Sequence, residues 1–478
     1  MPIEELLRSV WPYALSAASA LIAVLASAHV VLNKRDVRGT IAWVGFIWAL
    51  PIAGAALYAM LGINRIRRKA RILRPEQHVA LEDLEPHSRR PGDLDERARP
   101  LVRLVDRMVH HRLVAGNRVR LLRNGDEAFP AMLEAIDDAR RSVTLATYIF
   151  DNDRAGKRFC EALVRAKQRG VQVRVLIDDF GTMYSWPPIT RELERADVPL
   201  ARFLPTLVPW RMQYVNLRNH RKLCVVDGRI GFTGGMNIRE GNLLELRTKH
   251  ATQDVHARIE GPVVAHLQQA FSEDWHFSTG QELQGERFFP PLAEVGSVTA
   301  RGLPDGPDED FEVLRMTMIG ALSVAKRRVA IVTPYFVPDG ALITALNVAA
   351  MRGARVDIVL PARGNLALVH WACMGTVGQV LEHGCRVWLT PPPFDHTKLM
   401  VVDGSWTLLG SANWDMRTLR LNFEFNIECY DEPLAELASE LIEQRLQGAR
   451  RLTMKQIQTR SLPVRLRDGA ARLLSPYL

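Results

Sequence analysis

The stretch that decides the fold is Asn219-His220-Arg221-Lys222-Leu223-Cys224-Val225-Val226-Asp227-Gly228. It recurs as Asp395-His396-Thr397-Lys398-Leu399-Met400-Val401-Val402-Asp403-Gly404, and both copies read His-x-Lys-x-x-x-x-Asp. The match continues past the turn, because Gly234, Gly235 and Asn237 stand at the same offsets from the first His as Gly410, Ser411 and Asn413 do from the second. One copy is a weak signal, whereas two copies in register indicate a duplicated functional element.

Each motif predicts a strand followed by a turn. The run after each Lys is apolar and rich in β-branched residues, so a His and a Lys two positions apart project from one face of an extended chain. Asp-Gly then supplies turn chemistry, and a second apolar run follows from Arg229 to Thr233 and from Ser405 to Leu409. This pattern predicts a hairpin with an Asp-Gly turn, which presents an imidazole and an ammonium together.

A paired His and Lys suits phosphoryl transfer. The His can act as nucleophile or general acid, and the Lys can neutralise phosphoryl oxygens, so two facing pairs would form a site that needs no metal. The alternative, in which each pair only lies on a solvated strand face, leaves the duplication unexplained. The candidate catalytic residues are His220, Lys222, Asp227, His396, Lys398 and Asp403.

Four more residues are candidates for supporting this site, and they are Asp254, Glu424, Asn237 and Asn413. Either acid could orient an imidazole and stabilise its charged form, although an ordinary salt bridge is the competing interpretation. The two asparagines follow small residues and could bring amide donors close to phosphate oxygens. Because Asp227 and Asp403 stand at the turn after the strand, we interpret them as structural supports more than as proton carriers.

The order of predicted elements also occurs twice. A strand-like run from Ser142 to Phe150, a helical pattern and a strand from Val171 to Ile177 predict a βαβ unit. The order returns with strands at Arg328 to Thr333 and Arg355 to Leu360. We therefore expect an α/β fold with two homologous halves, residues 101–297 and 298–445, each a β-sheet flanked by helices and each supplying one motif.

Tyr148 and Tyr335 occupy equivalent predicted strand ends in these halves. A phenol there could contact a headgroup, and core packing is the alternative interpretation.

Two apolar runs precede the halves. Val10 to Leu32 and Ile41 to Ile63 contain no Lys, Arg, Asp or Glu, and each is long enough to cross a bilayer as a helix. Pro51 is expected to kink the second run. A cleaved signal peptide is the competing interpretation of the first, but its acidic leader and the second run argue against it. The sequence therefore predicts a two-helix transmembrane hairpin over residues 1–64.

Basic residues are concentrated beside this hairpin. The net charge is +9, from 62 Lys and Arg and 53 Asp and Glu. Six basic residues lie between Arg65 and Arg74, against three between Asn33 and Thr40, which favours cytoplasmic termini and attraction to anionic lipid. Residues 65–100 form a basic, Pro-containing linker, and residues 446–478 a basic tail that suits a membrane surface and a solvated helix equally well.

Other chemistries lack their motifs. The five cysteines are an odd number without a Cys-x-x-Cys spacing, which disfavours disulfides and zinc. We find no Walker-type loop, no His-Glu-x-x-His and no clustered carboxylates of the kind that hold a divalent metal. We expect no cofactor, no metal and no nucleic acid partner, and the sequence leaves the oligomeric state open.

The paired motifs resemble those of the phospholipase D superfamily. The runs from Ser411 to Glu424 and from Thr333 to Asp339 further resemble its bacterial cardiolipin synthases, over nearly the whole chain. The resemblance implies two phospholipase D-like halves with one shared active site. It also implies transfer of a phosphatidyl group from one phosphatidylglycerol to another, through a phosphohistidine on His220 with His396 as general acid, or the reverse, in the bacterial inner membrane.

Rival functions follow from the same residues. Water could intercept the intermediate, which would make the protein a hydrolase, and another alcohol or phospholipid, including phosphatidylethanolamine, could take part. A superfamily nuclease usually carries one motif per chain and no membrane hairpin. A membrane scaffold with relic motifs would not need both His-Lys pairs intact.

Overall fold

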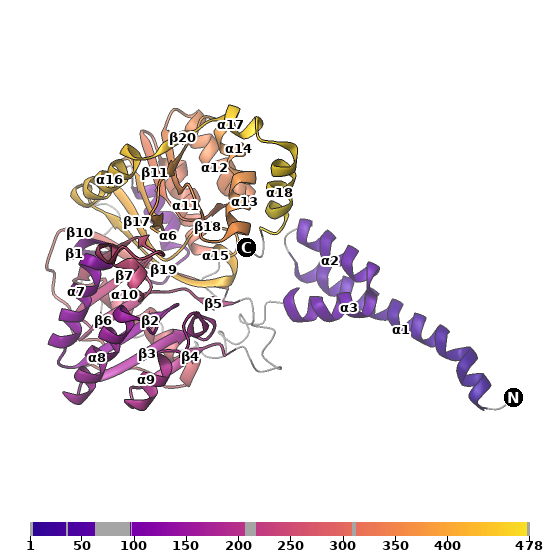
Figure 1. The fold of residues 1–478 in the computed structure, drawn as a ribbon, viewed down its shortest axis with the longest axis horizontal. Coiled ribbons are helices and arrows are strands. Elements are labelled where there is room, and N and C mark those ends of the chain that lie inside the picture. Colours follow the sequence, from indigo (N-terminus) through magenta and orange to yellow (C-terminus); the bar gives the residue numbers. More distant parts are fainter. Residues whose placement is uncertain are drawn as a thin grey trace. The chain divides into compact units, whose positions relative to one another are not determined.

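The computed structural model describes residues 3–34, 37–62, 96, 98–205, 217–307 and 312–475. The chain divides into two compact units, residues 1–69 with 206–216 and residues 70–205 with 217–478 (Figure 1). The first is helical in its described part, and the second is an α/β unit. The predicted basic run from Arg65 to Arg74 and most of the predicted linker lie outside the described residues.

The helical unit contains one long helix. Its elements are α1 (Ile3–Asn33), α2 (Val37–Ala49), α3 (Pro51–Leu57) and the π-helix η1 (Tyr58–Gly62). Within α1, Trp11–Asn33 is the one described helix long and apolar enough to cross a membrane. Tyr58 joins the helices, since its hydroxyl lies 2.8 Å from His29 Nδ1 and its ring contacts that of Trp43.

The second apolar run does not form the continuous span that the sequence predicts. Leu50 leaves the helical region at φ −139° and ψ 78°, and Pro51 starts a new helix because it has no N–H to continue the first. A Cβ added to Gly54 would lie 2.9 Å from the Cα atom of Ile47, a pair that a continuous helix separates by about 10 Å. The chain therefore turns back on itself at Leu50.

Neither arm of this turn is long enough to cross a bilayer. α2 has 13 residues, and α3 and η1 together have 7 plus 5, so each arm is about 20 Å long at most. A hydrocarbon core is about 30 Å thick. Among the described helices, the structure thus shows one of spanning length, Trp11–Asn33, and divides the predicted second span into shorter helices at Leu50.

The α/β unit has two regions, which we call the first region (residues 114–279) and the second region (residues 298–447). The helices of the first region are α7 (Asn124–Asp138), α8 (Arg154–Gln168), η3 (Phe180–Tyr184), α9 (Thr190–Arg195), η5 (Glu240–Asn242), η6 (Leu244–Leu246) and α10 (Val264–Thr279). Its strands are β1 (Val114–Arg123), β2 (Ser142–Thr147), β3 (Gln172–Asp178), β4 (Leu200–Phe203), β5 (Arg218–Asn219), β6 (Leu223–Val226), β7 (Ile230–Gly234), β8 (Thr252–Gln253) and β9 (Val255–Glu260).

The helices of the second region are α11 (Val313–Val324), α12 (Gly340–Met351), α13 (Ala367–Thr376), α14 (Gly378–Leu381), α15 (Thr418–Leu421) and α16 (Glu432–Gln447). Its strands are β10 (Val298–Asp305), β11 (Arg328–Val332), β12 (Phe336–Val337), β13 (Arg355–Pro361), β14 (Arg386–Thr390), β15 (Phe394–Asp395), β16 (Leu399–Val402), β17 (Trp406–Gly410), β18 (Trp414–Asp415) and β19 (Asn422–Tyr430). The flanking elements are α6 (Arg99–Asp106), β20 (Arg450–Leu452), α17 (Met454–Gln458) and α18 (Leu462–Leu473).

One sheet runs through both regions. Its order is β4-β3-β2-β6-β7-β9-β1 in the first region and β14-β13-β11-β16-β17-β19-β10 in the second, and β1 pairs with β10 where they meet. Each region contains the predicted βαβ step, β2-α8-β3 and β11-α12-β13, with parallel strands. The predicted hairpins are β6-β7 and β16-β17. Equivalent strands therefore follow in the same order from β1 through the first region and from β10 through the second.

Helix α6 and the basic tail pack differently from what the predicted boundaries of the two halves imply. Leu101 and Val105 of α6, at the start of the predicted first half, lie in the hydrophobic core of the second region. Gly320 of α11 makes room for this helix, since a Cβ there would lie 3.0 Å or less from side-chain atoms of Leu101 and Leu104. The basic tail is also part of the fold, because β20 extends the sheet beside β14 and α18 packs on α13.

Candidate active site

Each motif histidine is anchored by a strand from the other region. β5 pairs in parallel with the start of β19, and the His220 N–H donates to the Phe423 carbonyl over 2.8 Å. β15 pairs in parallel with β8, and the His396 N–H donates to the Gln253 carbonyl over 2.8 Å. The residue after each of these carbonyls is an acid, Glu424 or Asp254. The exchange of strands therefore brings each imidazole to a carboxylate of the opposite region.

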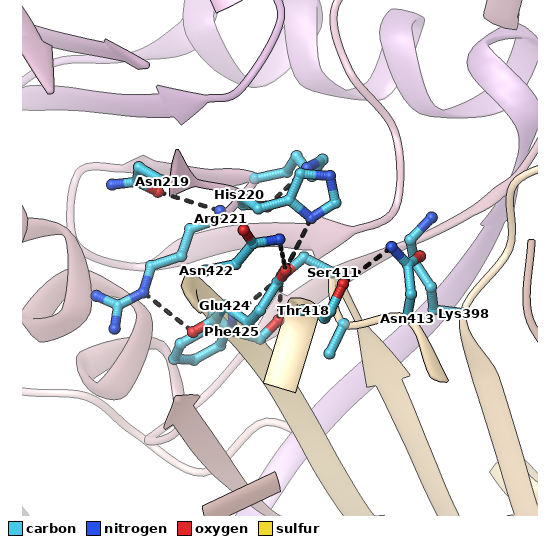
Figure 2. A network of polar contacts seen from close by, with 12 residues as sticks. Asn219, His220, Arg221, Lys398, Ser411, Asn413, Thr418, Asn422, Glu424 and Phe425 are labelled. Carbon is cyan, nitrogen blue, oxygen red and sulfur yellow. Dashed lines mark hydrogen bonds and ion pairs between the residues drawn. The ribbon is translucent and has the colours of Figure 1, made fainter. Parts of the chain in front are cut away.

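The carboxylates are crossed between the regions. The Nδ1 atom of His220 lies 3.0 Å from Glu424, as Figure 2 shows, and that of His396 lies 2.9 Å from Asp254. Both acids are fully buried, and the imidazole side chains are 12% and 13% exposed. A carboxylate at Nδ1 fixes the ring orientation and leaves Nε2 as the nitrogen available for chemistry.

The motif lysines lie beside their histidines. Lys222 Nζ donates to the His220 carbonyl over 2.6 Å, and Lys398 Nζ makes the same contact with the His396 carbonyl over 2.5 Å. Each His-Lys pair lies in the short link between two strands, β5 and β6 or β15 and β16, and not within the strand that the spacing predicts. Each ammonium has further donors that can meet an anionic ligand.

The charges of each His-Lys pair act on the histidine of the other pair. Burial lowers the pKa of His220 well below its usual value, and the charges of Lys222 and Lys398 lower it further. For His396 burial is again the main cause of the lowered pKa, followed by Lys398, Lys222 and His220. Both imidazoles are therefore neutral at neutral pH, which is the protonation state that a nucleophile requires.

The lysines and acids titrate close to neutrality. Burial lowers the pKa of Lys222 to about 7 and that of Lys398 to about 8. Burial also raises the pKa of Asp254 and of Glu424 to about 7 each, against the opposing charge of the lysines. Groups poised in this range can hold or release a proton during a reaction.

The motif aspartates lie at the other end of strands β6 and β16. The carboxylate of Asp227 accepts hydrogen bonds from the backbone N–H groups of residues 140, 141 and 142, and that of Asp403 from residues 326, 327 and 328. Both turn residues have positive φ, 53° and 52°. These contacts tie the hairpin turn to the start of the neighbouring strand, which is a structural role.

The two asparagines are buried close to the motif strands. Asn237 accepts the N–H of Ile149 over 3.1 Å, and Asn413 donates to Thr418 over 3.2 Å. The predicted tyrosines contact the histidine rings, with centroid distances of 5.3 Å for Tyr148 and His220 and 6.5 Å for Tyr335 and His396. Lys222 Nζ also lies 5.6 Å from the Tyr148 ring centroid.

Sequence reasoning missed the groups that hold the site residues in place. Glu424 accepts hydrogen bonds from Ser411 over 2.5 Å and from Asn422 over 3.0 Å (Figure 2). Arg221, between the first His and Lys, is fully buried and ion-pairs with Asp274 while donating to the Glu424 carbonyl. Arg221 and Ser411 lie within the repeated stretches and Asn422 lies two residues before Glu424, whereas Asp274, on α10, has no sequence signal that links it to the motif.

An ion pair also holds the second motif, but here the motif supplies the acid and the helix supplies the arginine. Asp395 accepts from Arg445 over 2.6 Å, and the same guanidinium donates to Thr397. A helix following the last long strand supplies the partner in both regions, α10 for Asp274 and α16 for Arg445. Among the residues with described positions, no group of three or more His, Cys, Asp or Glu is arranged to hold a metal ion.

Comparison with known proteins identifies this architecture. The family model described as cardiolipin synthase, PLD-like domain, matches residues 132–275 and 318–446, and a phospholipase D-nuclease N-terminal model matches residues 21–62. A crystal structure of phosphatidylserine synthase from Haemophilus influenzae has a similar fold, with a TM-score of 0.62 and 16% identity, covering 79% of this chain and 100% of that chain.

Curated relatives cover nearly the whole chain. The cardiolipin synthase of Geobacillus kaustophilus is 32% identical, with 96% of this chain and 94% of the relative covered. The major cardiolipin synthase of Bacillus subtilis is also 32% identical, with 95% and 97% covered, and cardiolipin synthase A of Pseudomonas putida is 31% identical, with 96% of each covered. The chain therefore belongs to the cardiolipin synthase family of phospholipase D-like enzymes.

Proposed function

We propose that this protein is a cardiolipin synthase that moves a phosphatidyl group from one phosphatidylglycerol to the glycerol hydroxyl of a second, giving cardiolipin and free glycerol. The observation that carries the proposal is a pair of His-Lys motifs, each with a buried carboxylate on the histidine, in which the lysine of each motif acts electrostatically on the histidine of the other. Such a pair of histidines can form and then consume a covalent phosphoryl intermediate.

In the first step, Nε2 of His220 attacks the phosphorus of the donor lipid. The bond from phosphorus to the glycerol oxygen breaks, and the departing oxygen takes a proton from His396. Lys222 and Lys398 stabilise the charge on the phosphoryl oxygens in the transition state. Glu424 and Asp254 orient the two imidazoles, because each carboxylate lies within 3.0 Å of an Nδ1 atom.

In the second step, the free hydroxyl of a second phosphatidylglycerol replaces glycerol. Its proton passes to His396, its oxygen bonds to phosphorus, and the bond from phosphorus to His220 breaks. No nucleotide is consumed, since one phosphodiester is exchanged for another.

The proton that His396 delivers is held by the His396–Asp254 pair. Burial raises the pKa of Asp254 to about 7 and lowers that of the imidazole, so the pair takes up one proton near neutrality on the carboxyl side. A bound phosphodiester adds negative charge beside the imidazole, which favours transfer of this proton to the ring.

The repeated strand order supports two homologous halves with a shared site. The first runs roughly over residues 101–297 and the second over 298–445, with the exception that α6 packs in the second core. The site residues proposed from the sequence keep their roles in this scheme, with Asp227 and Asp403 as turn supports and Asn237 and Asn413 beside the phosphate.

The membrane unit is proposed to cross the bilayer once, at α1. The turn-back of α2 and α3 then returns the chain to the side on which α1 ends, and the sequence is rich in Lys and Arg both just before α2 and just after η1. The positive-inside rule makes that side cytoplasmic, and the leader with Glu4 and Glu5 lies on the other. The catalytic halves thus act at the inner face of the bacterial cytoplasmic membrane.

Exposed apolar side chains border the site at both ends, which supports entry of lipid from a bilayer. After β3 the chain exposes Met183, Tyr184 and Trp186 by 53%, 52% and 82%, and Tyr184 contacts the Tyr148 ring beside His220. After β13 it exposes Leu366, next to the Asn365 that accepts the Tyr335 hydroxyl. Apolar patches of this kind suit a membrane interface.

The test is incubation of the purified full-length protein with phosphatidylglycerol labelled in an acyl chain and in the headgroup glycerol. Equal amounts of labelled cardiolipin and free glycerol support the proposal. Phosphatidic acid in place of cardiolipin would make the protein a hydrolase. A parallel reaction with a chelator examines the metal independence that the sequence predicts, and activity restored only by magnesium would refute it.

A further inference from the structure

A basic cavity lies between the two regions on the His396 side of the active site. Its volume is about 520 Å³. The first region contributes Lys249 and Thr252, and the second contributes Arg363, Asn365 and Phe394. The parallel pairing of β8 with β15, which puts Thr252 opposite Phe394, joins the two walls. The same strand exchange that builds the active site therefore builds this cavity.

The charge of the cavity is positive. Arg239, Lys249 and Arg363 line it, and no Asp or Glu is among the described residues that do. Arg239 is partly neutralised by Asp151 at 3.2 Å. Lys249 and Arg363 make no ion pair within the described part of the chain, and both side chains are exposed. Two cations that line one hollow from different regions suit a phosphate group, which can accept from both.

Two side chains that line the cavity, Phe394 and Asn365, contact residues of the active site. The ring centroid of Phe394 lies 6.1 Å from that of His396. Asn365 accepts the Tyr335 hydroxyl over 2.8 Å, while the Tyr335 ring contacts both Phe394 and His396. A ligand held in the cavity is thus one layer of side chains away from His396.

The reaction needs a second phosphate site of this kind. Each acceptor molecule carries its own phosphodiester, separated by one glycerol from the hydroxyl that attacks the intermediate. When that hydroxyl lies at the donor phosphorus, the acceptor phosphate must lie one glycerol away, in a place that neutralises its charge. Lys222 and Lys398 are already committed to the donor phosphoryl group in the proposed mechanism.

We propose that the cavity lined by Lys249 and Arg363 binds the phosphodiester of the acceptor phosphatidylglycerol. The assignment rests on the proposed function and deepens it. It also breaks the symmetry between the two motifs, because an acceptor held on this side presents its hydroxyl to His396. His396 is then the residue that takes the acceptor proton, and His220 is the nucleophile.

The corresponding place in the first region is filled differently. Counting from the ends of β3 and β13, Phe180 stands where Arg363 stands in the second region. The guanidinium of Arg218 lies 4.3 Å from the Phe180 ring centroid and covers it. An aromatic ring with a stacked cation replaces an open basic wall there, so the two sides of the active site differ in what they can bind.

The experiment compares two reactions of the full-length protein in vesicles of phosphatidylglycerol and phosphatidylcholine. Cardiolipin formation needs an acceptor with a phosphate. Exchange of the headgroup with labelled free glycerol uses the same donor and the same histidines, but its acceptor has no phosphate. The variant is Lys249→Gln with Arg363→Gln, and the matched control is Lys326→Gln with Arg195→Gln, two exposed cations outside the cavity.

The cavity variant should lose roughly tenfold or more in cardiolipin formation at low phosphatidylglycerol, since two charge-assisted contacts are removed. Its glycerol exchange should match that of the control variant. An equal loss in both reactions would overturn the assignment, because the cations would then serve the donor, the membrane or the fold. Unchanged cardiolipin formation would overturn it as well.

Inorganic phosphate distinguishes a lipid headgroup from a free anion. If the cavity regulates the enzyme by binding phosphate, added phosphate will change both reactions of the wild-type protein and neither reaction of the cavity variant, and this outcome overturns the acceptor assignment. If the wild-type protein exchanges glycerol but forms no cardiolipin, the proposed function fails together with the acceptor site. A cavity variant that fails alone leaves the proposed function intact.

Discussion

The Nδ1 atom of His220 lies 3.0 Å from the carboxylate of Glu424, which stands 204 residues later in the chain. The reciprocal pair, His396 and Asp254, spans 142 residues in the opposite direction. Each carboxylate therefore belongs to the region that does not contain its histidine. Neither region alone holds a complete pair, so the proposed reaction requires that the two regions pack against each other.

The crossed pairs predict a specific pattern of coupling between mutations. Glu424→Gln should lower the transfer rate on the order of 10³-fold, because the amide cannot stabilise a charged His220 ring. Adding Glu424→Gln to His220→Ala should cost nothing more, since the residue it serves is already gone. The measurement is a double-mutant cycle on cardiolipin formation by purified variants.

The control for this cycle is the uncrossed combination, Asp254→Asn with His220→Ala. Asp254 contacts His396, which is still present in this double variant. The double variant should therefore retain less activity than His220→Ala alone. Coupling of His220 with Asp254 in place of Glu424 would contradict the crossed arrangement.

The roles of the two histidines can be separated by the leaving group. A short-chain phosphatidyl ester of p-nitrophenol releases a phenolate that needs no general acid. We expect His396→Ala to release one equivalent of p-nitrophenol rapidly and to stop at the phosphohistidine, whereas His220→Ala should release none. Rapid-quench measurement of the burst decides between the assignments, and a burst in His220→Ala alone would reverse them.

The sequence predicts the strands and turns that carry the candidate active site better than it predicts the contacts around them. The His-Lys spacing, the Asp-Gly turns and the βαβ order are local features, and they lead directly to β5-β6-β7 and β15-β16-β17. The acids Asp254 and Glu424 are also recognisable, but the histidine that each holds depends on strands far apart in the chain. Arg221 and Arg445 brace the motifs through helices α10 and α16, whose positions no local pattern specifies.

The helical elements show the same limit. Pro51 marks an interruption, but a proline in an apolar run is compatible with a kink and with a full reversal. What decides between them is the contact of Gly54 with Ile47, which is tertiary. The packing of α6 in the second core, against Gly320, is likewise set by a partner more than two hundred residues away.

The pH dependence of the reaction should be a narrow bell. Lys222 and Lys398, with pKa values of about 7 and about 8, lose the charge that binds phosphate as the pH rises through this range. Glu424, with a pKa raised to about 7, loses the charge that supports His220 as the pH falls below it. Asp254, with a pKa of about 7, loses the proton that His396 delivers as the pH rises, so it contributes to the alkaline limb. We expect kcat/KM for a soluble short-chain phosphatidylglycerol to fall on both sides of neutrality.

The bell should widen when substrate is bound. An anionic phosphodiester stabilises the ammonium form of both lysines, so the alkaline limb of kcat should lie at higher pH than that of kcat/KM. Lys222→Arg should move the alkaline limb to higher pH more than Lys398→Arg does, because Lys222 has the lower pKa and Arg stays charged, at the cost of a lower maximal rate. An alkaline limb unchanged in Lys398→Arg and in Lys222→Arg would show that other groups control it.

Asp227 should matter for stability more than for turnover. Asp227→Ala leaves three backbone N–H groups without their acceptor and puts Ala at a positive φ, so the free energy of unfolding should fall by about 2 kcal/mol or more. Asp227→Asn keeps one acceptor oxygen and tolerates this φ, so its loss should be smaller. Thermal unfolding of both variants in detergent measures the loss of stability. The turnover rate per folded molecule is measured well below the unfolding midpoint. A large loss of turnover without loss of stability would make Asp227 catalytic.

The last prediction concerns which sides of the membrane the ends of the helical unit occupy. If α1 is the single crossing helix and the chain turns back at Leu50, Asn33 and the catalytic halves share the cytoplasmic side. Two crossing helices would put Asn33 on the opposite side from the halves. The native cysteines are all buried in the folded protein. Maleimide labelling of an added, exposed cysteine can therefore be measured with little labelling of the native ones.

Asn33→Cys and, as a cytoplasmic reference on the second region, Lys326→Cys can be labelled with a membrane-impermeant maleimide in intact cells and in inverted vesicles. Both positions are exposed. We expect both cysteines to react in inverted vesicles and neither in intact cells, because the basic residues on either side of the turn-back favour one cytoplasmic face. Labelling of Asn33→Cys in intact cells, with Lys326→Cys still protected, would show that the run from 41 to 63 crosses the bilayer after all and that the turn at Leu50 opens in the membrane.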